Sequence, residues 1–116
     1  MTLREKRILF STLISQQMLD MNSVEGYDAC FGEVVRTKAQ AQENAVSGVG
    51  ILNSLHLEGL AADINLYRDG SYIDTSEGHK LFGEIWKARH PMCKWGGDIK
   101  SRPDGNHYSF TDDKRI

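Results

Sequence analysis

Residues 60–67, LAADINLY, are the feature that most constrains how this chain can fold. Apolar residues occupy every second position, and Asp63 stands between them on the less apolar face. A period of two predicts a β-strand with one face in the core. Asp69 and Gly70 follow after Arg68 and predict the turn of a hairpin. A carboxylate on such a strand needs a partner, because burying an unpaired charge is costly.

Two longer segments carry the spacing of amphipathic helices, in which apolar residues recur every three or four positions. The first covers residues 3–21. The second is expected to begin at a capping box formed by Asp74 and Glu77, to end before Pro91 and to bury its Leu81/Ile85 stripe. The apolar residues at helical spacing are Phe10, Leu13, Ile14, Met18 and Met21 in the first helix, and Leu81, Phe82, Ile85 and Trp86 in the second.

The remaining pattern mixes further strands with a short helix. Residues 27–37 are rich in aromatic and β-branched side chains and predict a strand. Thr37 and Gln40 fit a capping box for a short helix that reaches about Val46. A last short strand is expected at residues 106–110. The fold class is therefore α+β, with a small, mainly antiparallel sheet and flanking helices.

Composition excludes several kinds of protein. The chain has 116 residues, the size of one domain over residues 1–116, and a net charge of −2, which argues against nucleic acid as a partner. No apolar run is long enough for stable membrane insertion, and the basic start lacks the cleavage site of a signal peptide. Cys30 and Cys93 form no CxxC pair, so free thiols are expected rather than a disulfide framework.

Two short stretches hold residues that can bind a metal ion: SLHLEGLAAD, with His56 and Asp63, and PDGNHYSF, with Asp104 and His107. Two histidines and one carboxylate are a known ligand set for catalytic zinc. We expect the strand of His107 to pair beside that of Asp63. Asp104, in a turn three residues earlier, is then placed to act as a general base. The spacing by itself leaves open a surface His56 with a capping or salt-bridged Asp63.

Several motifs taken together resemble a known family, the zinc D-Ala-D-Ala carboxypeptidases and L-alanyl-D-glutamate endopeptidases of the VanY/VanX type. The motifs are SxHxxGxAxD at residues 54–63, WGG at 95–97 and DGNHY at 104–108. The resemblance extends to LREKRILFSTL and FGEVVRT, over nearly the whole chain. It implies the fold shared by Hedgehog proteins and D,D-peptidases, Zn2+ as the cofactor, and the phage endolysin branch of the family.

The resemblance also assigns roles to single residues. Arg36 is expected to face the site and stabilise the oxyanion, with a surface arginine at a strand end as the alternative. Asp98 is the alternative to Asp104 as the base, and Trp95 is expected either against substrate or in the core. The implied roles are metal binding for His56, Asp63 and His107, catalysis for Asp104 and Arg36, and substrate binding for Ser54 and Trp95.

The activity implied by the resemblance is that of a zinc metallopeptidase, which hydrolyses the L-alanyl-D-glutamate bond of peptidoglycan stem peptides. Such a phage endolysin is expected to be a monomer, made in the host cytoplasm, that reaches the cell wall after the membrane is permeabilised. One alternative is a D,D-carboxypeptidase that removes terminal D-alanine, although no cation can be assigned to its substrate's free carboxylate. Another is a non-hydrolytic, zinc-stabilised binding module of the same fold.

Overall fold

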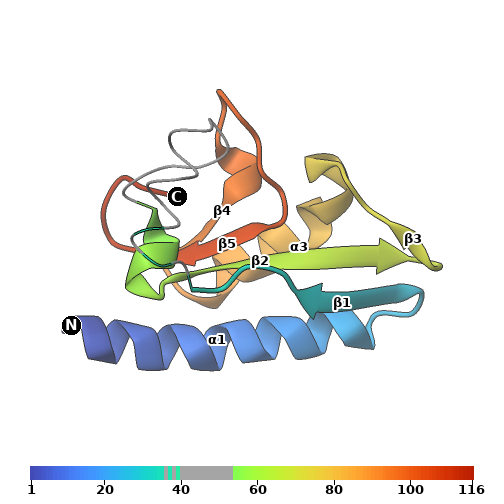
Figure 1. Cartoon of the computed structure of the whole chain (residues 1–116). Helices are drawn as coiled ribbons and strands as arrows, with labels where there is room; N and C mark the ends of the chain where they lie inside the picture. The colour runs from blue at the N-terminus through green and yellow to red at the C-terminus, as the bar shows by residue number, and fades with distance from the viewer. Residues whose placement is uncertain (36, 38, 40–53) are drawn as a thin grey trace.

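The computed structural model describes residues 1–35, 37, 39 and 54–116. Helices and strands are mixed along the chain, as Figure 1 shows. The short helix expected up to Val46 falls on residues outside this description. The elements are α1 (Leu3–Ser23), β1 (Tyr27–Phe31), η1 (Leu55–Glu58), β2 (Ala61–Arg68), β3 (Ser71–Tyr72), α3 (Ser76–Arg89), β4 (Cys93–Trp95), η2 (Gly96–Asp98) and β5 (His107–Phe110).

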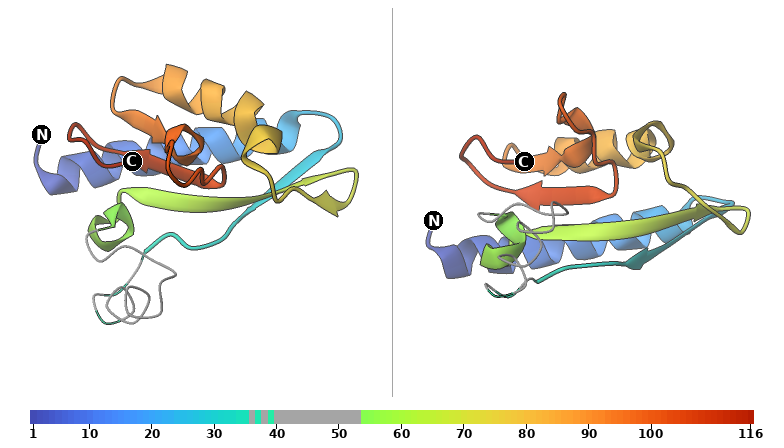
Figure 2. Two further views of the ribbon diagram at one scale, coloured as in Figure 1. Left: turned by 90° about the horizontal axis from the view of Figure 1, so that it is seen from above. Right: turned by 45° about the horizontal axis from the view of Figure 1, so that its top comes forward.

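The strands form one antiparallel sheet in the order β1-β2-β5-β4, with β3 also paired to β2. The long strand β2 is the centre of this sheet in both views of Figure 2. Its first residues pair with β5, where Asp63 lies opposite His107, and its later residues pair with β1 and β3. The expected class, a small antiparallel sheet with flanking helices, is confirmed.

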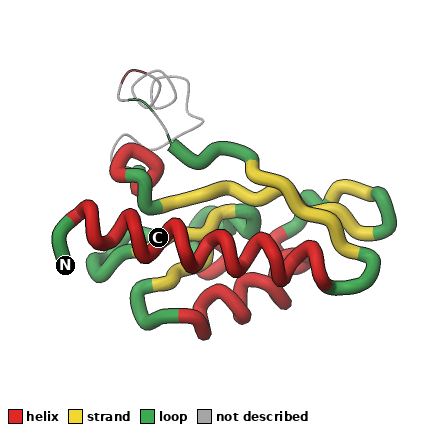
Figure 3. The backbone as a smooth tube through the Cα atoms, turned by 90° about the horizontal axis from the view of Figure 1, so that it is seen from below, coloured by secondary structure: helices red, strands yellow, loops and turns green. Residues whose placement is uncertain are grey.

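The helices α1 and α3 lie side by side, as Figure 3 shows. The buried side chain of Gln17 joins them: its Nε2 donates to the carbonyl of Phe82 at 2.9 Å, and its Oε1 accepts from Arg89 Nε at 2.8 Å. A buried amide satisfied in this way stabilises the helix pair instead of weakening it. Within the described part of the chain, neither helix is long and apolar enough to span a bilayer.

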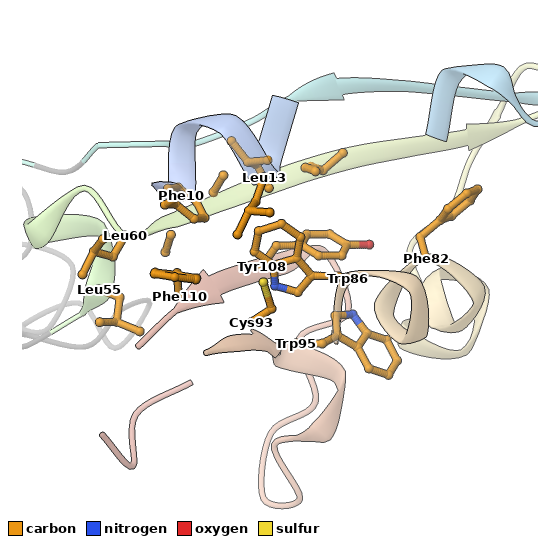
Figure 4. Close-up of a cluster of buried hydrophobic side chains, with 14 of the residues drawn as sticks. Phe10, Leu13, Leu55, Leu60, Phe82, Trp86, Cys93, Trp95, Tyr108 and Phe110 are labelled. Carbon is orange, nitrogen blue, oxygen red and sulfur yellow. The ribbon is translucent and has the colours of Figure 1, made fainter. Parts of the chain in front are cut away.

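The alternation of β2 determines which side chains enter the core. Ala62, Ile64 and Leu66 are fully buried, whereas Asp63 and Asn65 on the other face are only half-buried. Figure 4 shows the large side chains that pack between the helices and the sheet. The predicted strand and its two faces are confirmed. The labelled aromatic residues of this cluster are Phe10, Phe82, Trp86, Trp95, Tyr108 and Phe110.

Two details of α3 differ from the expectation. The helix is capped by Thr75, whose hydroxyl accepts from the Gly78 N–H at 3.2 Å, and not by Asp74. Leu81 is 52% exposed, so the expectation that it lies in the core is wrong. The helix instead turns Phe82 and Trp86, both fully buried, toward the sheet. Large aromatic rings bury more apolar area than a leucine, which favours this orientation of the helix.

Strand β1 is shorter than the strand expected at residues 27–37, but the chain continues to bond to β2 beyond it. The Gly32 N–H donates to the carbonyl of Asp63, and the Asp63 N–H donates to the carbonyl of Glu33, both at 2.7 Å. On its other side, Asp63 pairs with His107. Asp63 therefore lies between residues 32–33, which bond its backbone N–H and carbonyl, and β5, which places His107 opposite it. Strand β4 was not expected from the sequence.

Both cysteines are free thiols, as expected. Cys30 is exposed on β1, and Cys93 is buried on β4. Burial raises the pKa of the Cys93 thiol to about 12, so this thiol stays protonated at neutral pH. Neither cysteine belongs to the cluster of residues that could hold a metal ion.

Candidate metal centre

Three side chains from separate elements converge on the outer face of the sheet: His56 of η1, Asp63 of β2 and His107 of β5. Asp63 Oδ1 lies 3.2 Å from His56 Nε2 and 3.3 Å from His107 Nδ1. One ligand atom from each residue lies within 4.8 Å of the other two. The sequence predicted these three residues as ligands of one ion, and the structure brings them together.

The ring of His56 is oriented by a hydrogen bond of Nδ1, the ring nitrogen that does not face Asp63. Nδ1 lies 2.9 Å from the carbonyl of Val34, so this nitrogen must carry the proton and donate it. Nε2, 3.2 Å from Asp63 Oδ1, donates to that carboxylate when the ring is protonated and can bind a cation through its lone pair when the ring is neutral. Fixing the tautomer through the outer nitrogen is typical of histidines that bind metals. A carboxylate oxygen of Glu33 lies 3.8 Å from the same Nδ1.

The loop that carries His56 is tied to neighbouring segments. Ser54 caps η1, because its hydroxyl accepts from the His56 N–H at 3.2 Å. Gly59 ends η1 with a φ of 70°, a conformation that glycine adopts without strain. Arg7 Nε donates to the carbonyl of Glu58 at 2.6 Å, and Arg115 forms an ion pair with the Glu58 carboxylate. These contacts hold His56 in place.

The charges at the centre suit a divalent cation. Burial alone would raise the pKa of Asp63, but hydrogen bonds from His107 and His56 outweigh it and lower the pKa to about 2. Burial alone would lower the pKa of His56, but Asp63 and the carbonyl of Val34 outweigh it and raise this pKa. Asp63 is therefore ionised at neutral pH, which is the state that binds metal.

The donor set fits zinc. Two imidazole nitrogens and one carboxylate oxygen are the protein ligands of many catalytic zinc sites, which keep a fourth position open. The second nitrogen of His107, Nε2, is buried and has no hydrogen-bond partner among the described residues. An unsatisfied buried nitrogen is uncommon. An ion held by Nδ1 would not bond to this nitrogen, so the fit to zinc rests on the donor set.

Asp104 begins the turn that leads to His107. Its N–H donates to the carbonyl of Gly96 at 2.9 Å, and its own carbonyl accepts from the His107 N–H at 3.1 Å. The residue is exposed and borders a pocket of about 200 Å³, so water and a ligand can reach it. The pocket is lined by Tyr72, Ile73, Asp74, Thr75, Ser76, His79, Asp104, Gly105 and Asn106.

His79 borders this pocket although it belongs to none of the sequence motifs. Its Nδ1 lies 3.5 Å from the Tyr108 hydroxyl, and burial lowers the pKa of its imidazole. The ring is therefore neutral near pH 7. His79 lies three residues before Phe82 and seven before Trp86, both buried on α3. This helical spacing is the feature of the sequence that could have predicted an inward-facing His79.

The other residues expected at the site have different positions. Arg36 lies outside the described residues. Trp95 is buried, at 4% exposure, and its indole N–H donates to the carbonyl of Gly105. Of the two positions expected for Trp95, the structure shows the one in the core, where the indole contacts the Asp104–His107 turn. Asp98, the alternative base, forms an ion pair with Lys87 at 2.9 Å.

A His-Asp-His centre on a small antiparallel sheet, with an acidic residue three positions before the second histidine, has the ligands and the candidate base of a metal-dependent hydrolase. Residues 47–110 match the M15 peptidase family model that is described as D-alanyl-D-alanine carboxypeptidase. This match covers more than half of the 116 residues. The chain belongs to this family, and the resemblance noted in the sequence is confirmed.

One relative is the L-alanyl-D-glutamate peptidase of Listeria phage A118. It is 31% identical over 101 residues, which are 83% of this chain and 35% of the relative. The chain therefore spans about a third of the length of this curated relative.

Two solved structures share the fold. The Serratia marcescens L-Ala D-Glu endopeptidase ChiX matches with a TM-score of 0.73 and 20% identity, over 88% of this chain and 77% of that chain. A mutant of the vancomycin resistance D,D-pentapeptidase VanY, from a VanB-type cassette and in complex with Zn(II), matches with a TM-score of 0.58 and 19% identity. That match covers 89% of this chain and 71% of the VanY chain. Both confirm the expected fold.

Proposed function

We propose that this chain is a zinc-dependent peptidase that hydrolyses the L-alanyl-D-glutamate bond of peptidoglycan stem peptides, as a phage endolysin does. The convergence of His56, Asp63 and His107 beside the Asp104 turn is the observation that carries the proposal. The phage relative, named as an L-alanyl-D-glutamate peptidase, supports this choice of bond.

His56 Nε2, Asp63 Oδ1 and His107 Nδ1 would hold the ion, since these atoms face one another. When bound, zinc supplies a Lewis acid that polarises the scissile carbonyl and makes water more acidic. The Val34 carbonyl keeps the proton of His56 on the outer nitrogen. The strand pairing of Asp63 with His107 keeps these two ligands opposite each other without the ion.

Asp104 is the proposed general base and acid. Its carboxylate accepts a proton from the attacking water and later gives it to the leaving amine. The exposure of Asp104 at the edge of the pocket allows both water and the amine to approach it. Arg36 is proposed to stabilise the oxyanion, and Ser54, at the start of the His56 loop, is proposed to lie near bound substrate.

The alternative carboxypeptidase needs a group that binds the free terminal carboxylate of its substrate. None of the described residues that line the pocket beside Asp104 is a lysine or an arginine, and two of them, Asp74 and Asp104, are acidic. The described residues of this pocket therefore assign no cation to that carboxylate, and the choice of the L-alanyl-D-glutamate bond rests on the phage relative.

The proposal also covers the oligomeric state of the enzyme and the place where it acts. Residues 1–116 are proposed to form one catalytic domain that acts as a monomer on stem peptides. The enzyme is proposed to be made in the host cytoplasm and to reach the cell wall after the membrane is permeabilised. The phage relative supports action on the wall.

A zymogram distinguishes hydrolysis from simple binding. Purified protein in a gel that contains peptidoglycan should produce a cleared band. The band should disappear with a chelator and return with zinc but not with magnesium, because nitrogen ligands favour zinc. Retention of the protein on peptidoglycan with no clearing at any zinc concentration would identify the non-hydrolytic binding module instead.

A further inference from the structure

Trp95 lies in a slot between two glycines. Figure 4 shows its side chain beside α3, and the residue is 4% exposed. A Cβ on Gly83 of α3 would lie 2.3 Å from the indole, and a Cβ on Gly97 of η2 would lie 2.2 Å from it. No side chain tolerates such distances, so only glycine at both positions leaves room for the ring. The indole is therefore fixed on two sides.

The indole N–H of Trp95 points at the Asp104–His107 turn. It donates to the carbonyl of Gly105 at 2.7 Å. Gly105 is buried, and its own N–H donates to the hydroxyl of Ser76 at 2.9 Å. Buried backbone groups need partners within the protein. Trp95 and Ser76 supply both partners for the residue that directly follows Asp104.

Gly96 holds the same turn from the next position along the chain. Its carbonyl accepts the Asp104 N–H at 2.9 Å. A Cβ on Gly96 would lie 2.2 Å from the Asp104 carbonyl oxygen and 2.8 Å from the His107 Cβ. The WGG segment therefore packs directly against the Asp104–His107 turn.

Asp104 and His107 are anchored in different ways. His107 is the first residue of β5 and pairs with Asp63 of β2. Asp104 belongs to no strand and is exposed. Its position depends on the hydrogen bonds of the turn, including the one from Trp95 to Gly105. Loss of that bond should displace Asp104 more than it displaces the metal ligands.

We propose that Trp95 is a positioning residue that fixes Asp104 through Gly105, and that Gly83 of α3 sets the position of Trp95. Because Asp104 is the proposed proton acceptor, the effect of Trp95 on turnover depends on the proposed function. The effect of Trp95 on the geometry of the turn does not depend on it.

The test compares Trp95→Phe, Gly83→Ala and the double variant. Each single variant should lower kcat by about 10- to 100-fold, because small misplacements of a catalytic group are costly. Alanine favours the helix more than glycine does, so a lower kcat in Gly83→Ala cannot be caused by a lower helix propensity. The phenyl ring of Trp95→Phe is smaller than the indole and leaves room for the methyl group that Gly83→Ala adds. In the Trp95→Phe background, Gly83→Ala should therefore lower kcat much less than it does in the wild type.

Trp86→Phe is the matched control. Trp86 is also buried, and its indole N–H donates to the carbonyls of Lys94 and Ser109 at 2.9 and 3.1 Å, away from the turn. This variant should lower the Tm while leaving kcat of the folded protein unchanged. The zinc Kd should change little in Trp95→Phe. Hydrogen exchange at the Asp104 amide should be faster in Trp95→Phe and Gly83→Ala but not in Trp86→Phe.

Two results would overturn the positioning role. One is a kcat of Trp95→Phe that equals the wild-type kcat when it is measured at a temperature well below the Tm of the variant. The other is exchange at the Asp104 amide that Trp95→Phe and Trp86→Phe raise equally. If the wild-type chain hydrolyses no peptidoglycan, the proposed function fails, whereas the exchange measurement still decides whether Trp95 fixes the turn.

Discussion

His56→Ala and His107→Ala are each expected to remove bound zinc and to lower turnover by more than about a thousandfold, because a Lewis acid contributes several kcal/mol to catalysis. Each change removes one of three side chains that meet around Asp63 Oδ1. Two remaining protein ligands are too few for a stable catalytic zinc site. Metal content after dialysis, measured by mass spectrometry, and peptide hydrolysis both report the loss.

His90→Ala is the matched control for the ligand variants. The imidazole of His90 accepts the Met92 N–H at 3.0 Å and does not belong to the metal-binding cluster. This variant should retain one zinc ion per chain and most of the activity. Stoichiometric zinc and normal turnover in His56→Ala would contradict the assignment of the centre.

Asp104→Asn is expected to lower kcat by about 10²- to 10⁴-fold, the usual contribution of general acid–base catalysis. The amide keeps the size of the carboxylate but cannot accept the proton of water. The backbone bonds of Asp104 to Gly96 and His107 do not involve the side chain, so the turn should persist. Zinc content should therefore equal that of the wild type, and kinetics with a soluble stem peptide measure the loss.

The control for this variant is Asp98→Asn. Asp98 lies in the same loop region but forms an ion pair with Lys87 on the surface, so its loss should cost little activity. An active Asp104→Asn combined with an inactive Asp98→Asn would show that the base has been assigned to the wrong aspartate.

The strand of Asp63 could be predicted from the sequence because its signal is local. A period of two appears within residues 60–67 themselves, and it places Asp63 on the face opposite the core. The meeting of Asp63 with His107, 44 residues away, has no such local signal. The ligand set of two histidines and one carboxylate suggested this pairing, and the motifs of the family supported it before the structure showed it.

The groups that orient the site could not be predicted, because most belong to the backbone. The partner of His56 Nδ1 is the carbonyl of Val34, and the partner of the Trp95 indole is the carbonyl of Gly105. Every residue has a carbonyl, so the sequence does not show which one a side chain reaches. For this reason the sequence left Trp95 either against substrate or in the core, and its contact with the turn was not expected.

The errors in α3 have local causes. Asp74 and Thr75 are adjacent, and both residue types cap helices well. Thr75 forms the cap, which starts the helix one residue later. Leu81 and Phe82 are also adjacent, and neighbouring positions of a helix point in different directions. The buried aromatic residues Phe82 and Trp86 determine the inward face, and Leu81 is left exposed.

Mass spectrometry of the products released from purified peptidoglycan is the most direct test of the proposed activity. Hydrolysis of the L-alanyl-D-glutamate bond should release peptides that begin with D-glutamate and leave L-alanine as the new C-terminus on the glycan. A chelator should prevent both products. Free D-alanine as the only product would show a D,D-carboxypeptidase and would contradict the proposed bond.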